Sequence, residues 1–400
     1  MATPDNAQRG GLLAMLHKFA YFSSFLYACI IALLATPFFQ RHAVYQHAVR
    51  IPWGAKFDLP EKYRLAPGKT LNCKLTTSDN VTIGAWFVLS EPFYQSLRQA
   101  SPSLEQPSLA AVQEAVRTCP TILYFHGNAA TRAAPRRVQH YSAFSSRLRT
   151  NVLAIDYRGF GDSDGTPSED GLTEDAKTAW RWLLDQGAKP EDVMLVGHSL
   201  GTGVTSRLAT FLAREGVKPR GVALLAPFTS LSSVLETYDI GGFPILQPLQ
   251  TFAMGRKLLK KLLRHEFDTL GVIKDINVPL FIAHSQNDMD IPHHHSRTLL
   301  DVLLDPHLPA SPVSFPDTPD QILSSEDYAT FLEAQKQRRA ARNELVRKVE
   351  VPTFGTVEEF EGTAGKVVYV ETFWGAHADV GLQEGVQDAM ASTFRLAQHL

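Results

Sequence analysis

Residues 193–204 read VMLVGHSLGTGV, an apolar run that leads into the motif GHSLG at 197–201. The apolar run favours a buried strand, and the small residues that follow favour the start of a helix. Glycines on both sides of the serine remove the Cβ atoms that would collide in a sharp turn between strand and helix. The motif therefore predicts a nucleophile elbow that exposes the Ser199 hydroxyl, and the flanking elements weigh against the alternative of a helix-capping serine.

The overall composition is that of an ordinary globular protein. The chain has 400 residues, of which 44% are hydrophobic and 20% charged, and its formal net charge is -2. These values allow a large buried core and differ from those of disordered chains. Since no strongly basic surface is indicated, we expect no nucleic-acid partner.

The N-terminal region contains one long uncharged segment. Residues 19–39, FAYFSSFLYACIIALLATPFF, could cross the hydrocarbon core of a bilayer. We predict a transmembrane anchor between a tail at 1–18 and a juxtamembrane connector at 40–70. A cleaved signal peptide is the alternative, although no small-x-small cleavage site closes the run. Basic residues lie on both sides, so the positive-inside rule leaves the orientation open.

From residue 71 onward the pattern predicts one α/β domain that extends to residue 400. Residues 71–77 and 81–88 read as a hairpin, and 91–118 as a polar surface segment that is helical at most. Helical stretches such as 173–186 and 203–214 alternate with continuous apolar runs, which predicts a mostly parallel sheet with helices on both faces. The apolar runs are 121–125, 152–155, 193–196, 222–225, 280–283 and 366–370.

Two stretches exceed a minimal domain of this kind. The first, at about 227–275, is expected to be a cap-like segment and contains the basic run RKLLKKLLR at 256–264. That run reads as a solvated helix packed by its leucines, or as a lid or lipid-surface element. The second, at about 305–362, begins Pro-rich, continues helical and charged, and is expected to be a solvated insertion.

A reactive serine needs a base to take its proton and a carboxylate to orient that base. Such partners follow the serine in chain order at the ends of later strands. The loop HSQNDMDIP at 284–292 supplies the acid, and the D-x-x-[VI]-P spacing favours Asp288 over Asp290. His377, in the loop after the final strand, is assigned as the base.

A tetrahedral oxyanion also needs hydrogen-bond donors near the serine. We assign these to the backbone N–H groups of Asn128, in the loop after the strand at 121–125, and of Leu200. His126 and His198, beside these positions, are expected to brace the loops.

Several other motifs carry weaker signals. Asn80 begins an N-x-[ST] sequon at the hairpin turn and is a candidate glycosylation site. Cys73 and Cys119 could form one disulfide or remain two unpaired thiols. Neither the Gly-rich loop at 156–165 nor the run His293-His294-His295 has a convergent ligand pattern, so we expect no metal and no cofactor.

Taken together, the motifs resemble those of single-pass membrane α/β-hydrolase-domain lipases, most closely the lysophosphatidylserine and monoacylglycerol lipases of the endoplasmic reticulum. The resemblance implies an α/β-hydrolase fold, a lumenal catalytic domain, and hydrolysis of a lipid ester through an acyl-Ser199 intermediate. The insertion at 305–362 departs from the family's core pattern. The matching segments are HGN at 126–128, DYRGFGDSDGTPSEDG at 156–171, GHSLGTGV at 197–204, HSQNDMDIP at 284–292 and GAH at 375–377.

Two further functions stay open at this point. The same three catalytic groups also cleave thioesters and amides, so a protein depalmitoylating thioesterase or a peptidase is one alternative. The other is a non-catalytic membrane scaffold, against which the presence of all three groups in the required order argues. The sequence identifies no protein partner.

Overall fold

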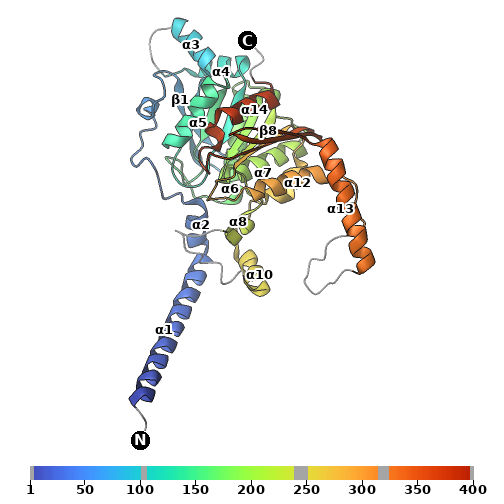
Figure 1. Ribbon diagram of the computed structural model, residues 1–400. Coiled ribbons are helices and arrows are strands. Elements are labelled where there is room, and N and C mark those ends of the chain that lie inside the picture. The colour runs from blue at the N-terminus through green and yellow to red at the C-terminus, as the bar shows by residue number, and fades with distance from the viewer. Residues whose placement is uncertain (1–3, 101–105, 238–250, 314–323, 397–400) are drawn as a thin grey trace.

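The computed structural model of the protein describes residues 4–100, 106–237, 251–313 and 324–396. Within these residues a ten-stranded sheet forms the centre of the domain, with helices on both of its faces (Figure 1). The strands are β1 (Thr70–Thr76), β2 (Thr82–Val88), β3 (Thr121–Phe125), β4 (Asn151–Ile155), β5 (Val193–His198), β6 (Gly221–Leu225), β7 (Leu280–Ser285), β8 (Arg347–Val351), β9 (Gly355–Gly362) and β10 (Gly365–Thr372).

The helices include one long N-terminal element and several that cover the sheet. They are α1 (Pro4–Leu34), α2 (Pro37–Tyr45), α3 (Glu91–Ala100), α4 (Leu109–Thr118), α5 (Pro135–Ser146), α6 (Glu169–Asp185), α7 (Leu200–Arg214), α8 (Leu231–Thr237), α10 (Ala253–Leu262), α11 (Thr269–Val272), α12 (His294–Leu304), α13 (Ser325–Leu345) and α14 (Glu384–Phe394). Residues 238–250 of the predicted cap-like segment and 314–323 of the predicted insertion lie outside the described residues.

The sheet runs in the order β1-β2-β4-β3-β5-β6-β7-β10-β9-β8. Its central strands, from β4 to β10, pair in parallel, and the strands at both ends are antiparallel. Every apolar run that the sequence indicated as a strand is one, so the predicted mostly parallel α/β architecture is confirmed.

The continuous apolar character of these strands follows from burial on both faces. Along β5, Val193 and Leu195 point into one hydrophobic core, whereas Met194 and Val196 point into the other. Helices α6 and α7 cover the first core, and α5 and α14 cover the second. Because the central strands pair in parallel, their carboxyl ends lie at one edge of the sheet.

Helix α4 corrects the expectation that residues 91–118 lie at the surface. Val112, Ala115 and Val116 are buried in the core. Their spacing of three and four residues places them on one face of the helix, so the segment is amphipathic rather than wholly polar.

The insertion at 305–362 also differs from its predicted form. Only α13 is the charged helix that was expected, and residues 347–362 instead form the hairpin of β8 and β9, which extends the sheet. Charged side chains suit an edge hairpin because they face solvent and deter further strand pairing. All residues of the edge strand β8 are exposed, and Glu359 of β9 joins its neighbours through ion pairs with Arg347 at 2.7 Å and Lys366 at 2.6 Å.

The N-terminal apolar helix projects from the domain (Figure 1). Residues Ala14–Leu34 are long and apolar enough to cross a membrane, and none of that window is buried in the protein. This candidate span begins and ends earlier than the predicted 19–39. Its end is set by helix α1, which stops at Leu34, and a new helix, α2, begins at Pro37.

The segment predicted as a connector, residues 40–70, packs into the domain. Tyr45 is fully buried, and its carbonyl accepts a hydrogen bond of 2.9 Å from the Ala129 N–H. Phe57 and Leu65 also belong to the core. The connector therefore joins the candidate span to the domain through packed contacts and not as a free linker.

The hairpin of β1 and β2 carries two features singled out in the sequence. Asn80 is exposed at its turn with φ of 62°, a left-handed conformation that asparagine tolerates. Cys73 and Cys119 are free thiols, so the disulfide alternative is not realised in this structure. Burial raises the pKa of the Cys73 thiol to about 12.

The Gly-rich loop at 156–165 holds a buried ion-pair network. Arg132, which has no exposed surface, binds Asp156 at 2.7 Å and Asp162 at 2.6 Å. Its guanidinium also lies 3.9 Å from the ring centroid of Phe57 and donates to Asn72. The acidic residues of this loop thus neutralise a buried arginine.

We expect Arg132→Met to destabilise the protein strongly, because it leaves the fully buried Asp156 without its cationic partner. Removal of one member of a buried pair typically costs about 3–5 kcal/mol. The matched control is Arg181→Met, which breaks an exposed pair with Glu174 and should cost about 1 kcal/mol or less. Chemical denaturation of the detergent-solubilised protein measures both changes, and equal losses would contradict a structural role for the network.

Candidate active site

The turn between β5 and α7 places Ser199 at the carboxyl edge of the sheet. Ser199 has φ of 54° and ψ of -125°, a strained conformation for a residue with a side chain. The flanking glycines are required by close contacts. A Cβ on Gly197 would lie 2.4 Å from the Gly201 carbonyl oxygen, and one on Gly201 would lie 2.1 Å from that of Phe125. The predicted elbow therefore has the expected geometry.

Three loops bring the predicted serine, histidine and aspartate together. His377 Nε2 lies 2.8 Å from Ser199 Oγ, and His377 Nδ1 lies 2.8 Å from Asp288 Oδ2. With a proton on Nδ1, the ring donates to the carboxylate and its Nε2 accepts the serine proton. The residues follow β5, β7 and β10, whose carboxyl ends share one sheet edge.

Asp288, and not Asp290, contacts the histidine. Asp288 is buried, and its Oδ1 accepts hydrogen bonds from the N–H groups of Asp290 and Ile291, both at 2.9 Å. Burial favours the neutral acid, but hydrogen bonds from His284 and His377 hold the pKa of Asp288 well below its usual range. Asp288 is therefore ionised at neutral pH and can orient His377.

His284 is a site residue that the sequence reasoning missed. It has no exposed surface, and its Nε2 lies 3.1 Å from Asp288 Oδ2 and 2.8 Å from the Ile291 carbonyl oxygen. Its Nδ1 lies 2.6 Å from Ser296 Oγ. The imidazole of this β7 residue thus connects the loop that carries Asp288, called the acid loop below, to α12. Its position four residues before the acid was the one available signal.

The predicted oxyanion donors, Asn128 and Leu200, line the same cavity as Ser199 and His377. The neighbouring N–H groups of Ala129 and Ala130 are occupied by carbonyls of the connector. Among the described residues, neither Asn128 nor Leu200 has an acceptor for its own N–H. Both amides therefore remain available for a ligand oxygen at this cavity.

Arg137 is a second residue that the sequence did not identify. Its Nη2 donates to the carbonyls of Gly127, Asn128 and Ala129 at 3.0, 2.9 and 2.6 Å. By holding three successive carbonyl oxygens, this buried guanidinium fixes the orientation of the peptide groups in the loop.

The histidines beside the site hold its loops. His198 Nε2 lies 2.8 Å from the carbonyl oxygen of His377, and burial lowers the pKa of His198 well below its ordinary value. His126 Nδ1 lies 2.7 Å from the Gly127 carbonyl oxygen, and burial lowers the pKa of His126 to about 4. Both rings are therefore neutral at pH 7.

Among the described residues, one group has the geometry to hold a metal ion. Asp288, Asp290 and His377 place ligand atoms within 4.8 Å of one another. Two of these residues already form the hydrogen-bonded chain to Ser199, which the charge of a metal would disrupt. In the run at 293–295, His295 is instead buried with its Nδ1 2.9 Å from Thr229 Oγ1.

The cavity above Ser199 has a volume of about 380 Å³ and a mostly apolar lining. Its walls come from α2, from the segment around α8, and from the acid loop. The apolar lining residues are Ala43, Val44, Leu200, Phe228, Leu231, Val234, Leu235 and Ile291.

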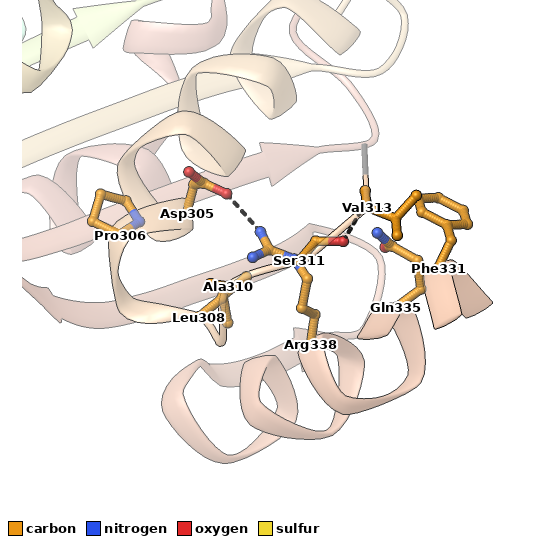
Figure 2. A pocket seen from close by; sticks show the side chains of 9 residues that line it. All are labelled: Asp305, Pro306, Leu308, Ala310, Ser311, Val313, Phe331, Gln335 and Arg338. Atoms are coloured by element: carbon orange, nitrogen blue, oxygen red, sulfur yellow. Dashed lines mark hydrogen bonds and ion pairs between the residues drawn. The ribbon is translucent and has the colours of Figure 1, made fainter. Parts of the chain in front are cut away.

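A second pocket, of about 530 Å³, lies beside α13 (Figure 2). There Arg338 binds Asp305 at 2.6 Å, and the Ser311 hydroxyl donates to the Val313 carbonyl. Among the residues that the structure describes, its lining contains no histidine that could activate that serine. The smaller cavity at Ser199 is therefore the candidate active site.

Comparison with known proteins agrees with the α/β architecture described above. Residues 122–364 match the family model described as "Alpha/beta hydrolase family". Lysophosphatidylserine lipase ABHD12 of Xenopus tropicalis is 32% identical over 307 residues, which cover 74% of each chain. The protein of the same name in Danio rerio is 28% identical over 297 residues, again 74% of each chain.

A solved structure shows the same architecture at low sequence identity. The crystal structure of an alpha-beta hydrolase from Vibrio vulnificus aligns with a TM-score of 0.52 and 16% identity, over 90% of this chain and 94% of that one. At this identity the likeness concerns the fold alone.

The hydrogen-bond geometry predicts how Ser199 reacts with a fluorophosphonate probe. Ser199→Ala should abolish labelling, and Asp288→Asn should slow it by about 10²- to 10⁴-fold, because the amide cannot stabilise the imidazolium. Asp290→Asn, a matched change in the same loop, should label at nearly the wild-type rate. Time-resolved labelling of the solubilised protein gives these rates. A larger loss in Asp290→Asn than in Asp288→Asn would contradict the assignment.

Proposed function

Because the chain belongs to the alpha/beta hydrolase family, we propose that it is a membrane-anchored serine hydrolase that cleaves carboxylic ester bonds of lysophospholipids or monoacylglycerols. The observation that carries the proposal is the hydrogen-bonded series Ser199–His377–Asp288 at the base of an apolar cavity. An activated serine fits acyl transfer, and an apolar wall fits a hydrocarbon chain.

The reaction begins when Ser199 Oγ attacks the ester carbonyl carbon and His377 Nε2 takes the hydroxyl proton. The N–H groups of Asn128 and Leu200 stabilise the oxyanion of the tetrahedral intermediate. When the intermediate collapses, His377 returns the proton to the leaving alcohol oxygen, and the acyl group remains on Ser199. Asp288 stabilises the imidazolium throughout.

The second half of the reaction uses water in place of the alcohol. His377 removes a proton from water as the water oxygen attacks the acyl-Ser199 carbonyl, and the proton then passes to Ser199 Oγ as the fatty acid leaves. The alcohol and the fatty acid are the two products, and the enzyme is regenerated.

Two observations support a lipid ester as substrate. The relatives are named lysophosphatidylserine lipases. In addition, a mostly apolar cavity of about 380 Å³ favours one acyl chain over the two chains of a diacyl lipid.

The membrane side belongs to the same proposal. We place the catalytic domain in the lumen of the endoplasmic reticulum, held by the helix Ala14–Leu34. The exposed turn at Asn80 would then be open to glycosylation, since a glycan there meets no packed element. An endoglycosidase-sensitive mass shift that disappears in Asn80→Gln would support lumenal placement.

A substrate panel tests the activity. We expect the full-length protein to hydrolyse lysophosphatidylserine or monooleoylglycerol faster than a palmitoyl-cysteine thioester or a peptide, because only the lipids combine an oxygen ester with one free acyl chain. The release of fatty acid is measured by mass spectrometry, with Ser199→Ala as the inactive control. Preference for the thioester or the peptide would contradict the lipase assignment. Fatty acid release that persists in Ser199→Ala would contradict the proposed nucleophile.

A further inference from the structure

The catalytic cavity reaches the membrane helix through α2. Ala43 and Val44 of α2 line the cavity above Ser199, and they also line a smaller apolar pocket of about 80 Å³. Leu235 of α8 is common to both pockets. The two spaces therefore adjoin, with the same side chains as their shared wall.

The smaller pocket lies between the C-terminal end of α1 and helix α10. Ile31 and Leu34 of α1 form one side. Leu259, Leu262 and Leu263, in and just after α10, form the other. Mostly apolar side chains thus line two adjoining pockets, one at the last turn of the candidate span and one at the nucleophile.

Gln40 fixes α10 beside α2. Its Nε2 donates to the Leu262 carbonyl at 3.0 Å, and its Oε1 accepts from the Arg264 N–H at 2.7 Å. Leu262 ends α10, where the carbonyl has no partner inside the helix, so the buried Gln40 amide caps it. The helix consequently lies next to the C-terminal end of α1 (Figure 1).

The outer surface of α10 is both basic and apolar. No acidic residue occurs between 251 and 264. Phe252 and Met254 are 69% and 81% exposed, although they are large and apolar. The basic residues of the segment are Arg256, Lys257, Lys260, Lys261 and Arg264.

We propose that α10 docks on an anionic membrane surface and that lipid substrate enters the catalytic cavity from the bilayer between α2 and α10. The lysines then meet lipid head groups, while Phe252 and Met254 enter the acyl boundary. The substrate acyl chain moves along the apolar wall at Val44 without crossing bulk water. This inference rests on the proposed lipid hydrolase activity and adds the route and the surface.

A membrane is favoured over an acidic protein partner by position. Gln40 holds α10 against the connector that directly follows the candidate span, so the helix lies at the level where that span leaves the bilayer. Exposed aromatic and thioether side chains among lysines are typical of interfacial helices. An acidic peptide would be attracted by the same charges, and the test separates the two cases.

The test uses full-length protein in lipid nanodiscs that contain monooleoylglycerol. The variant carries Lys257→Gln, Lys260→Gln and Lys261→Gln, which remove charge but keep most of each apolar stem. In discs with phosphatidylserine, we expect its hydrolysis to fall about tenfold or more relative to wild type, since each lysine near an anionic surface strengthens the attachment. Hydrolysis of soluble p-nitrophenyl acetate and fluorophosphonate labelling should stay unchanged.

A matched control carries Lys189→Gln, Lys336→Gln and Lys348→Gln, three exposed lysines outside α10. It has the same net charge as the first variant and should hydrolyse the lipid at the wild-type rate. Wild-type rates in the α10 variant, or an equal fall in the control, would overturn the proposal. An equal fall in discs of phosphatidylcholine alone would also overturn it, because the loss would not depend on anionic lipid. Of these outcomes, wild-type rates in the α10 variant would favour an acidic protein partner for the basic helix. Absence of labelling in the wild type would instead refute the proposed function.

Discussion

The backbone conformation of Ser199 is the constraint on which the site depends. A positive φ at a residue with a side chain is unfavourable and persists only where the surroundings enforce it. Here α7 approaches β5 so closely that Gly197 has no room for a Cβ, and it approaches the end of β3 so closely that Gly201 has none either. The Ser199 N–H is in turn fixed by a hydrogen bond of 3.0 Å to the Leu225 carbonyl in β6. The packed core thus holds Ser199 in this strained conformation, in which its hydroxyl lies within hydrogen-bond distance of His377.

The second organising feature is the packing of the connector, residues 40–70, into the domain. The chain from Gln40 to Ile51 caps α10, walls the catalytic cavity, and accepts hydrogen bonds from the loop that contains Asn128. The end of the candidate span and the active site are therefore joined by residues that line both of the adjoining apolar pockets.

The sequence predicts those features whose physical cause is local. Strands buried on both faces have to be continuously apolar, and the elbow needs glycines at fixed positions. Both patterns can therefore be recognised in the sequence itself. The close approach of Ser199, Asp288 and His377 also follows, because parallel strands end at one edge. Strands β8 and β9 were not predicted, because their charged residues follow directly on those of helix α13 and read as part of the same charged stretch.

Features defined by distant partners were not predictable in this way. Arg137 is important because three carbonyls of another loop converge on it, and Gln40 because it meets Leu262, 222 positions later. His284 looks like an ordinary strand residue until its contact with Asp288 is known. In each case the role of a buried polar side chain becomes clear only from the groups that form hydrogen bonds with it.

The central claim is that Ser199 carries the acyl group of a lipid during turnover. Acid quenching of the full-length enzyme during hydrolysis of monooleoylglycerol, followed by peptide mass spectrometry, tests this most directly. We expect an oleoyl adduct on the peptide that contains Ser199, with none in His377→Ala. Turnover with the acyl group on a different residue, or with wild-type rates in Ser199→Ala, would contradict it.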